Sequence, residues 1–525
     1  MLRALLRSGL LRPGRPWRLA RQLLALWKWG LGPAGQVYTA AARSPDMVAI
    51  VDEDGQVTYG ELLRRVKELS QTLQEFPARR VGVLSRNHRG AVEGMAAALV
   101  AGADAVLLNT QLKSPQLVQV VQEQGLDLLY HEAEFASSAS AIPGVEVPWK
   151  RLARIHVPEL WAPRMSPAEQ PTPRRRVSPR TSRRSARVIM LTAGTTGVPK
   201  GAALSRPPGL APLLSILSRI PLRVGDRIFI AVPLFGMWGH GALQAALSLR
   251  ATVVLRRRFN PVETLRMVEK EGCTVLIAAP VMLERILELP HQPPASLRLV
   301  VVGGSALSGQ LATRFMDAYG DVLYNVYGST EASCVSLAVP SDLRRCPDTV
   351  GRPPQGIEVA ILGPDGEPVP TGSVGRIFVR SAMLFGGYIS STSRIAGPEQ
   401  RRGMTATGDL GHLSDDGLLF VDGREDDMII SGGENVFPGP VEALIAALPQ
   451  VREVAVIGVP DATYGQSLAA FVVVREGMSL DAEQVRAHVR ANLTRPSVPR
   501  DVTFLPELPR NPAGKVIPRN LPGMS

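Results

Sequence analysis

Short apolar runs that alternate with helical segments constrain the fold of this 525-residue chain more than any other feature. Buried strands are predicted at residues 80–84, 105–108, 275–277 and 299–302, and helices at residues 61–74 and 261–271. Continuous apolar strands separated by helices are typical of parallel sheets covered on both faces. We therefore predict an α/β fold with a large, multi-subdomain N-terminal domain whose sheets are mostly parallel.

A second, smaller unit is predicted near the C-terminus. A boundary lies near residues 423–428, and strands are expected near residues 454–459 and 470–474. Before that boundary, residues 171–187 contain seven arginines and three prolines, which indicates a solvated loop between subdomains. The organisation expected is thus a segment 1–45, a large domain 46–426 and a small α+β domain 427–525.

The first 45 residues are basic, because the first acidic residue of the chain is Asp46. Apolar side chains with helical spacing stand at Leu19, Leu23, Leu26 and Trp27, and Arg18, Arg21 and Lys28 fall mostly on another face. Three interpretations stay open: a helix on an anionic membrane surface, a mitochondrial transit segment, or a helix packed on the protein's own surface.

Composition narrows the partners. The net charge is +12, but no zinc-finger spacing or aromatic RNA-binding motif is present, so nucleic acid is not expected as a partner. The cysteines, at 273, 334 and 346, fit neither a metal motif nor a disulfide framework, which indicates reduced thiols in a cytoplasmic protein. No apolar run approaches the ~18 residues that a membrane span needs.

The strongest motif is LTAGTTGVPKG at residues 191–201, directly after a short apolar run. Glycines and threonines permit a tight turn with free N–H groups and hydroxyls, which suits a polyphosphate, and lysine adds a positive charge. The spacing differs from that of a Walker A loop. The residues proposed to bind phosphate are Thr192, Gly194, Thr195, Thr196, Gly197 and Lys200.

This string resembles the phosphate loop of the adenylate-forming superfamily, which includes acyl-CoA synthetases, adenylation domains of peptide synthetases, and luciferases. Ala193 stands where that family most often has serine. Further strings match in the family's order: GGSAL at 303–307, YGSTE at 327–331, TGD at 407–409, GREDD at 423–427 and NPAGK at 511–515. The resemblance covers about residues 47–520.

The resemblance implies roles for these residues. Gly304 and Ser305 would lie along the adenine of ATP, Tyr327 would pack on it beside Gly328, also an ATP-binding residue, and Thr330 would contact phosphate. Glu331 would help to hold magnesium, since a hard cation prefers carboxylate oxygen. Asp409 would accept hydrogen bonds from the ribose hydroxyls, and Arg424 would contact ribose and phosphate.

The resemblance also implies a mobile C-terminal domain. Asp427 would be the hinge, with Asp426 as the competing position, and Gly432 and Gly433 would line a tunnel for coenzyme A. Lys515 would be the catalytic lysine, with Thr330 and Glu331 assisting in the chemistry.

PLFGMWG, residues 233–239, resembles the family's acid-pocket motif, which implies Phe235, Gly236 and Gly303 as residues that line the pocket. Family members often carry histidine where Gly236 stands, and His240 is four residues further on. This departure weakens any close inference about the acid. The overall resemblance favours a fatty acid.

The implied reaction uses ATP and Mg²⁺ to convert a carboxylic acid to acyl-AMP, and coenzyme A to form acyl-CoA. Two alternatives stay open: a ligase that loads a carrier-protein phosphopantetheine (or passes the acyl group to oxygen, as in luciferase chemistry), and a catalytically impaired protein that binds nucleotide or acyl groups.

Overall fold

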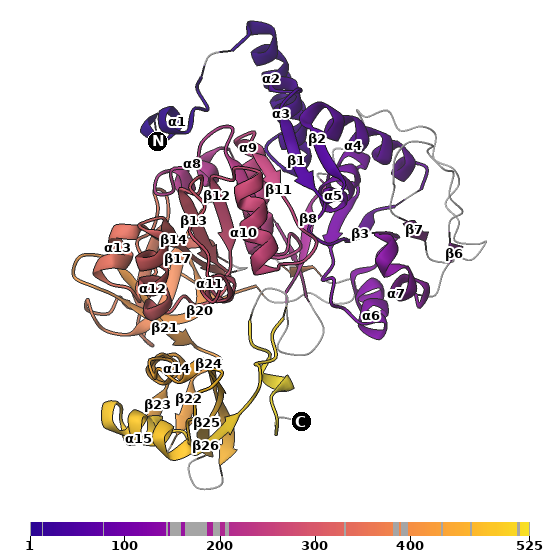
Figure 1. Cartoon of the computed structure of the whole chain (residues 1–525). Helices are drawn as coiled ribbons and strands as arrows, with labels where there is room; N and C mark the ends of the chain where they lie inside the picture. The colour runs from indigo at the N-terminus through magenta and orange to yellow at the C-terminus, as the bar shows by residue number, and fades with distance from the viewer. Residues whose placement is uncertain are drawn as a thin grey trace.

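We analysed a computed structural model of the chain, and it describes residues 2–12, 14–76, 78–142, 145–146, 159–162, 186–192, 200–204, 209–329, 332–381, 388–389, 397–431, 434–461, 465–511 and 515–523. A large body formed by the first four-fifths of the chain carries a smaller C-terminal unit at one end (Figure 1). The described strands form four sheets.

The first sheet is parallel except at its two edges. Apolar runs build its central strands, and the side chains of these strands are almost entirely buried. In spatial order the strands are β15 (Ser333–Ala338), β14 (Leu323–Ser329), β13 (Leu299–Gly303), β12 (Val275–Ala278), β10 (Arg227–Ile230), β11 (Thr252–Val254), β1 (Val48–Asp52) and β2 (Gly55–Thr58).

The second sheet has a centre of four parallel strands and antiparallel flanks. In spatial order its strands are β18 (Tyr388–Ile389), β9 (Lys200–Ala203), β8 (Val188–Thr192), β4 (Asp104–Leu107), β3 (Arg80–Leu84), β5 (Leu128–His131), β7 (Glu159–Ala162) and β6 (Val145–Glu146).

Helices of the large domain follow these strands in the chain and cover the sheets (Figure 1). They are α3 (Pro33–Arg43), α4 (Tyr59–Gln74), α5 (Arg89–Ala101), α6 (Ser114–Gln124), η1 (Ala133–Phe135), α7 (Ala136–Ser140), α8 (Ala211–Leu217), α9 (Met237–Ser248), α10 (Pro261–Lys270), α11 (Pro280–Leu287), α12 (Gly309–Tyr319) and α13 (Pro340–Arg345). The mostly parallel α/β architecture predicted from the sequence is confirmed.

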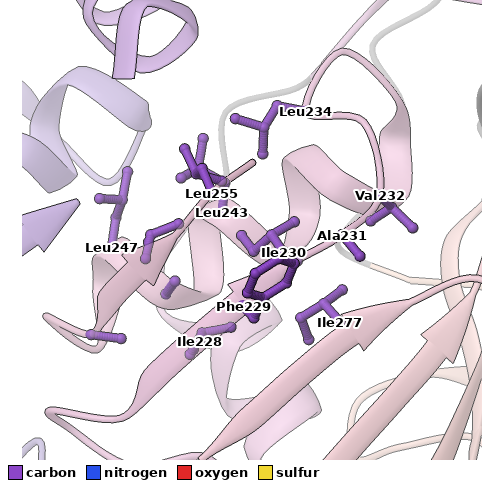
Figure 2. Close-up of a cluster of buried hydrophobic side chains, with 14 of the residues drawn as sticks. Ile228, Phe229, Ile230, Ala231, Val232, Leu234, Leu243, Leu247, Leu255 and Ile277 are labelled. Carbon is purple, nitrogen blue, oxygen red and sulfur yellow. The ribbon is translucent and has the colours of Figure 1, made fainter. Parts of the chain in front are cut away.

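The largest hydrophobic core lies where α9 packs on the first sheet. Leu243 and Leu247 of α9 are buried beside Phe229 and Ile230 of β10 (Figure 2). Burial of side chains of this size contributes roughly 1.5–3 kcal/mol each. The core fixes the rotation of α9 and thereby determines which of its other side chains face away from the sheet.

A third, antiparallel sheet stands beside the end of the first. Its strands are β16 (Glu358–Leu362), β17 (Gly375–Arg380), β20 (Met404–Leu413), β19 (Gln400–Arg401) and β21 (Leu419–Arg424). The register of β20 with β21 sets Asp409 opposite Arg424.

The small C-terminal unit has its own sheet and core. It contains β22 (Ile429–Ser431), β23 (Glu434–Val436), α14 (Pro438–Ala446), β24 (Val451–Asp461), β25 (Gly465–Val474), α15 (Ala482–Asn492), η2 (Arg495–Ser497), β26 (Asp501–Phe504) and η3 (Pro518–Asn520). Strands that alternate with helices here agree with the predicted small C-terminal domain.

The N-terminal segment differs from the single unit expected over residues 1–45. Val37 and Ala40 of α3 are 0% and 1% exposed, so this helix belongs to the core of the large domain. By contrast, α1 (Leu2–Ser8) and α2 (Pro16–Trp29) lie at the periphery (Figure 1). Helix α2 has no buried residue. None of the helices in the described part of the chain has the length and apolar character that crossing a membrane requires.

The pH dependence of stability in the small domain is predicted from Glu442 of α14. Burial, opposed by the hydrogen bond that its Oε1 accepts from the Val456 N–H at 2.7 Å, raises the pKa of Glu442 to about 7. The folded state therefore binds a proton more tightly than the unfolded state, and stability is lost as pH rises from about 4.5 towards 7. The Glu442→Gln protein should gain thermal stability relative to the wild type as the pH rises. At pH 8 its unfolding temperature, compared with that of the wild type, should be higher than the same comparison gives at pH 5.

Thermal unfolding of both proteins at the two pH values measures this change, which we expect to be about 2 °C or more. Glu483→Gln is the control, because hydrogen bonds from Arg486 and Arg490 lower the pKa of that exposed carboxyl. A gap between wild type and Glu442→Gln that stays constant with pH would contradict the prediction.

Candidate functional site

A cleft of about 2490 Å³ lies where the large body meets the C-terminal unit. It is lined by residues of the first and third sheets, of α3, α8 and α9, and of the C-terminal unit. Of the residues singled out from the sequence, the cleft brings together Gly236, Gly303, Gly304, Ser305, Tyr327, Gly328, Asp409, Arg424, Asp427 and Lys515.

One side of the cleft is organised around the carboxylate of Asp409, which is 7% exposed. The Tyr327 hydroxyl donates to Asp409 Oδ2 at 2.5 Å, and Arg424 Nη1 approaches Asp409 Oδ1 at 3.3 Å. The Asp409 N–H donates to Thr407 Oγ1 at 3.1 Å, and that hydroxyl donates to the Ile377 carbonyl at 3.1 Å. Two sheets are thereby joined through one carboxylate.

The electrostatics of this group follow from burial and from the negative charge of Asp409. Burial, the Asp409 charge and the hydrogen bond to it together raise the pKa of Tyr327 well above its usual range, so the phenol stays a donor. Burial alone would lower the pKa of Arg424, but the charges of Asp409 and Asp426 outweigh it and raise that pKa. Arg424 therefore stays a cation at the rim of the cleft.

A glycine turn at the end of β13 forms the floor beside this group. Gly304 has φ +87°, a left-handed conformation that favours glycine. A Cβ at Gly303 would lie 2.9 Å from the Val326 carbonyl oxygen and 3.3 Å from Trp238. Trp238 is held in place by the hydrogen bond that its Nε1 donates to the Ala278 carbonyl at 2.9 Å. Gly303 is therefore required by the close approach of backbone and ring, and Gly304 by its left-handed conformation.

The phosphate string is described only at its two ends. Thr192 ends β8 and Lys200 begins β9, and the two are paired antiparallel. Outside the described residues lie Gly194, Thr195, Thr196, Gly197, Thr330, Glu331, Gly432 and Gly433.

Lys515 reaches the cleft from the C-terminal unit. Its N–H donates to Asn511 Oδ1 at 2.9 Å, and the side chain is exposed. Nearby, Arg510 donates to Glu453 at 2.8 Å. Burial and the Glu453 charge raise the pKa of Glu284, on α11 of the large domain, to about 6, against the opposing effect of Arg510. The two parts of the chain therefore meet through charged groups.

The opposite side of the cleft differs in part from the expected acid pocket. Gly236 caps the N-terminus of α9 and lines the cleft, whereas Phe235 is half-buried against the main core and is not among the lining residues described. Trp238 and His240 line this side and were not singled out as site residues from the sequence. The four-residue spacing of polar side chains on α9 was the available signal.

Among the described residues, one group of three side chains has the spacing of a metal site: Asp52, Asp54 and His88. Arg89 occupies the Asp52 carboxylate through several hydrogen bonds, and none of the three lines the cleft. These residues therefore do not offer a metal ion a place in the cleft.

The family model of the AMP-binding enzyme matches residues 37–389, and that of the AMP-binding enzyme C-terminal domain matches residues 440–515.

Curated relatives and solved structures match nearly the whole chain. A feruloyl-CoA synthase from Amycolatopsis sp is 33% identical over 91% of this chain and 96% of its own length. An indoleacetate–CoA ligase from Aromatoleum aromaticum is 31% identical over 91% of this chain and 94% of its own. The amide bond synthetase McbA from Marinactinospora thermotolerans has a TM-score of 0.78 at 30% identity, covering 93% of this chain and 97% of its own.

Asp409→Asn should weaken the binding of AMP by about 10- to 100-fold, since it removes a charge that orients Tyr327 and Arg424 and supplies charge-assisted hydrogen bonds. Titration calorimetry with AMP measures the loss. Asp426→Asn is the matched control, because Asp426 is exposed and meets Arg424 only at 3.4 Å. Equal affinities for AMP in the two variants would contradict the assignment of Asp409 to the nucleotide-binding site.

Proposed function

The chain belongs to the AMP-binding enzyme family and is an acid–thiol ligase, and on that premise we propose its substrate and reaction. The protein activates an extended, mainly apolar monocarboxylic acid as its acyl-adenylate, with magnesium. It then transfers the acyl group to coenzyme A. The observation that carries the proposal is the single cleft lined by the Asp409 group, the Gly303–Gly304 turn and Lys515. These are the parts that nucleotide binding and carboxylate activation require in one place.

The chemistry needs positioning more than covalent help. A carboxylate oxygen attacks the α-phosphorus of ATP and pyrophosphate leaves, so the acyl carbon gains AMP as a leaving group. Asp409 would hold the ribose hydroxyls, and Arg424 would hold ribose and phosphate. Lys515 would stabilise the charge that develops between carboxylate and α-phosphate. Bound magnesium would offset the phosphate charge, and Glu331 is the residue proposed to hold it, with Thr330 contacting phosphate.

The second half-reaction needs a different arrangement, because a thiol must reach the acyl carbonyl where Lys515 stands. We place the hinge at Asp427, which lies between β21 of the large body and β22 of the small unit. Rotation there would withdraw Lys515 and bring Gly432 and Gly433 towards the cleft.

The cleft wall beyond Gly236 is the reason for proposing an acid with an apolar body. Leu213, Ile216 and Ala245 line it, and α8 and α9 supply no charged lining residue among those described. A fatty acid, favoured from the sequence, is one acid of this kind. The relatives, by their names, act on feruloyl and indoleacetate groups, so aromatic acids fit the proposal equally.

An amine is the second acceptor to consider, because one structural neighbour is an amide bond synthetase at 30% identity. Attack of an amine on the acyl-adenylate would give an amide instead of a thioester. Product analysis with coenzyme A, with an amine and with a carrier protein separates these acceptors.

The test of the ligase proposal is AMP release from ATP and magnesium across carboxylates from acetate to oleate and aromatic acids. We expect release that requires both an acid and coenzyme A. Lys515→Ala should lower acid-dependent pyrophosphate exchange by at least 100-fold yet keep thioester formation from supplied acyl-adenylate. Lys270→Ala, a change of an exposed lysine that does not line the cleft, is the control. Pyrophosphate exchange without any CoA-dependent release would overturn the CoA assignment.

We also propose that α2 contacts an anionic membrane surface. Its exposed side chains include Trp17, Leu23, Leu24 and Trp27, with Trp27 86% exposed. Positions 17, 20, 24 and 27 share one helix face. Arg21 and Lys28 flank that face, and no acidic residue precedes Asp46, so the charge complements anionic headgroups.

The other face of α2 explains why the apolar face stays outward. Trp29 stacks on Tyr38 of α3 at 4.3 Å, and Arg18 pairs with Asp46 at 2.9 Å. A Cβ at Gly35 would lie 2.0 Å from the Gly30 carbonyl oxygen, so α2 and α3 approach closely there. Helix α2 is therefore fixed with Trp17 and Trp27 directed to solvent.

Flotation with vesicles that contain phosphatidylglycerol tests this contact. Wild type should float with anionic vesicles and less with neutral ones, and Leu23→Ser with Trp27→Ser should lower the bound fraction at least 5-fold. Val374→Ser, at an apolar side chain 50% exposed elsewhere, is the control. Equal flotation of all three proteins would show that α2 is not the contact.

A further inference from the structure

The cleft extends beyond the nucleotide side into a lobe lined by α3, α8 and α9. Gln36 of α3, Pro212 of α8, and His240 and Gln244 of α9 all line it. Apolar residues of α8 also line it, as expected for any acid with a hydrocarbon body. The polar side chains of α3 and α9 need a separate explanation.

These polar side chains form a stripe along α9. His240, Gln244 and Ser248 are spaced four residues apart and so share one face. The core instead takes Leu243 and Leu247 on the adjoining face (Figure 2). At a rise of 1.5 Å per residue, His240 and Gln244 stand about 6 and 12 Å along the helix axis from Gly236. The stripe therefore begins one helical turn beyond the acid pocket.

Part of this stripe is satisfied by the protein. Gln36 Nε2 donates to Ser248 Oγ at 3.0 Å, which ties α3 to α9. Within the described part of the chain, three buried atoms next to it have no hydrogen-bond partner: His240 Nδ1, Gln244 Nε2 and Gln36 Oε1. His240 and Gln36 are only 4% and 7% exposed. Buried polar atoms are nearly always bonded, so these three atoms are free to bind a polar group of a ligand in this part of the cleft.

The chemistry of these atoms selects that group. Gln244 Nε2 donates and Gln36 Oε1 accepts, and a neutral imidazole offers one donor and one acceptor. Burial lowers the pKa of His240 to about 4, so its ring is neutral at pH 7. Among the described lining residues of α3, α8 and α9 none is charged, which leaves a second carboxylate or a sulfonate without a counterion. A hydroxyl both donates and accepts, and it is uncharged.

We infer that the acid activated by this protein carries a hydroxyl group, about 6–12 Å beyond its carboxylate, that His240 and Gln244 bind. This inference rests on the proposed ligase function and specifies its substrate class. Phenolic acids and hydroxy fatty acids share the required chemistry. A site built to bond a hydroxyl discriminates strongly against the analogue that lacks it, because its buried polar atoms then stay unpaired.

The test compares matched acids. The panel pairs 3-(4-hydroxyphenyl)propanoate with its 4-methyl and unsubstituted analogues, and 8-hydroxyoctanoate with nonanoate and octanoate. Wild type should favour the hydroxy acid by about 10- to 100-fold in kcat/KM in at least one pair. Gln244→Leu and His240→Phe should reduce that ratio to near 1 and improve use of the methyl analogue. Gln122→Leu, on the exposed side of α6, is the control.

Calorimetry of the same acids with the AMP-bound protein keeps the two proposals distinguishable. Hydroxy-selective binding without AMP release would overturn the ligase proposal and support the hydroxyl site. The hydroxyl site would be overturned if neither pair of acids showed a preference for the hydroxy acid in AMP release or in binding. It would also be overturned if the preference were unchanged in both variants. Either outcome would leave the ligase proposal intact.

Discussion

The buried carboxylate of Asp409 is the contact on which the site depends. A carboxylate out of water needs partners, and here they come from different sheets: Tyr327 from the first, and Arg424 from the strand opposite Asp409 in the third. The antiparallel sheet is thereby held beside the ends of the parallel strands, where ligands of α/β folds usually bind. The glycine turn of β13 and the ring of Trp238 complete the same wall.

The short connection between β21 and β22 has a consequence for catalysis. Arg424 ends β21 and Ile429 begins β22, so four residues separate the side chains proposed to bind the nucleotide from the small unit. A rotation within them would move Lys515 while leaving the bond between Tyr327 and Asp409 intact. The acyl-adenylate would then stay bound through its nucleotide while Lys515 moves away from the acyl carbon and the thiol of coenzyme A approaches it.

Local patterns explain what the sequence predicted. Buried parallel strands are continuous apolar runs, and β3, β12 and β13 were predictable for that reason. Tyr327, Asp409 and Arg424 stand in short strings of glycines and polar residues, and the structure brings them together. Contacts between residues far apart in the chain explain the features that the sequence did not predict. Helix α3 reads as part of a basic leader, yet it is buried, and the bond from Gln36 to Ser248 joins residues 212 positions apart. No local pattern reports such a partner.

Trp29 connects the two surfaces for which ligands are proposed. It ends α2, whose outward face carries Trp17 and Trp27, and it also lines the cleft near Gln36. If α2 rests on a bilayer, the lobe along α9 ends close to the lipid surface, where acids with an apolar body and a polar group concentrate. A hydroxyl then favours the pocket over the hydrocarbon interior, because it is bonded in the lobe and unsatisfied in the membrane core. The polar stripe on α9 would thus select a substrate and also draw it out of the membrane.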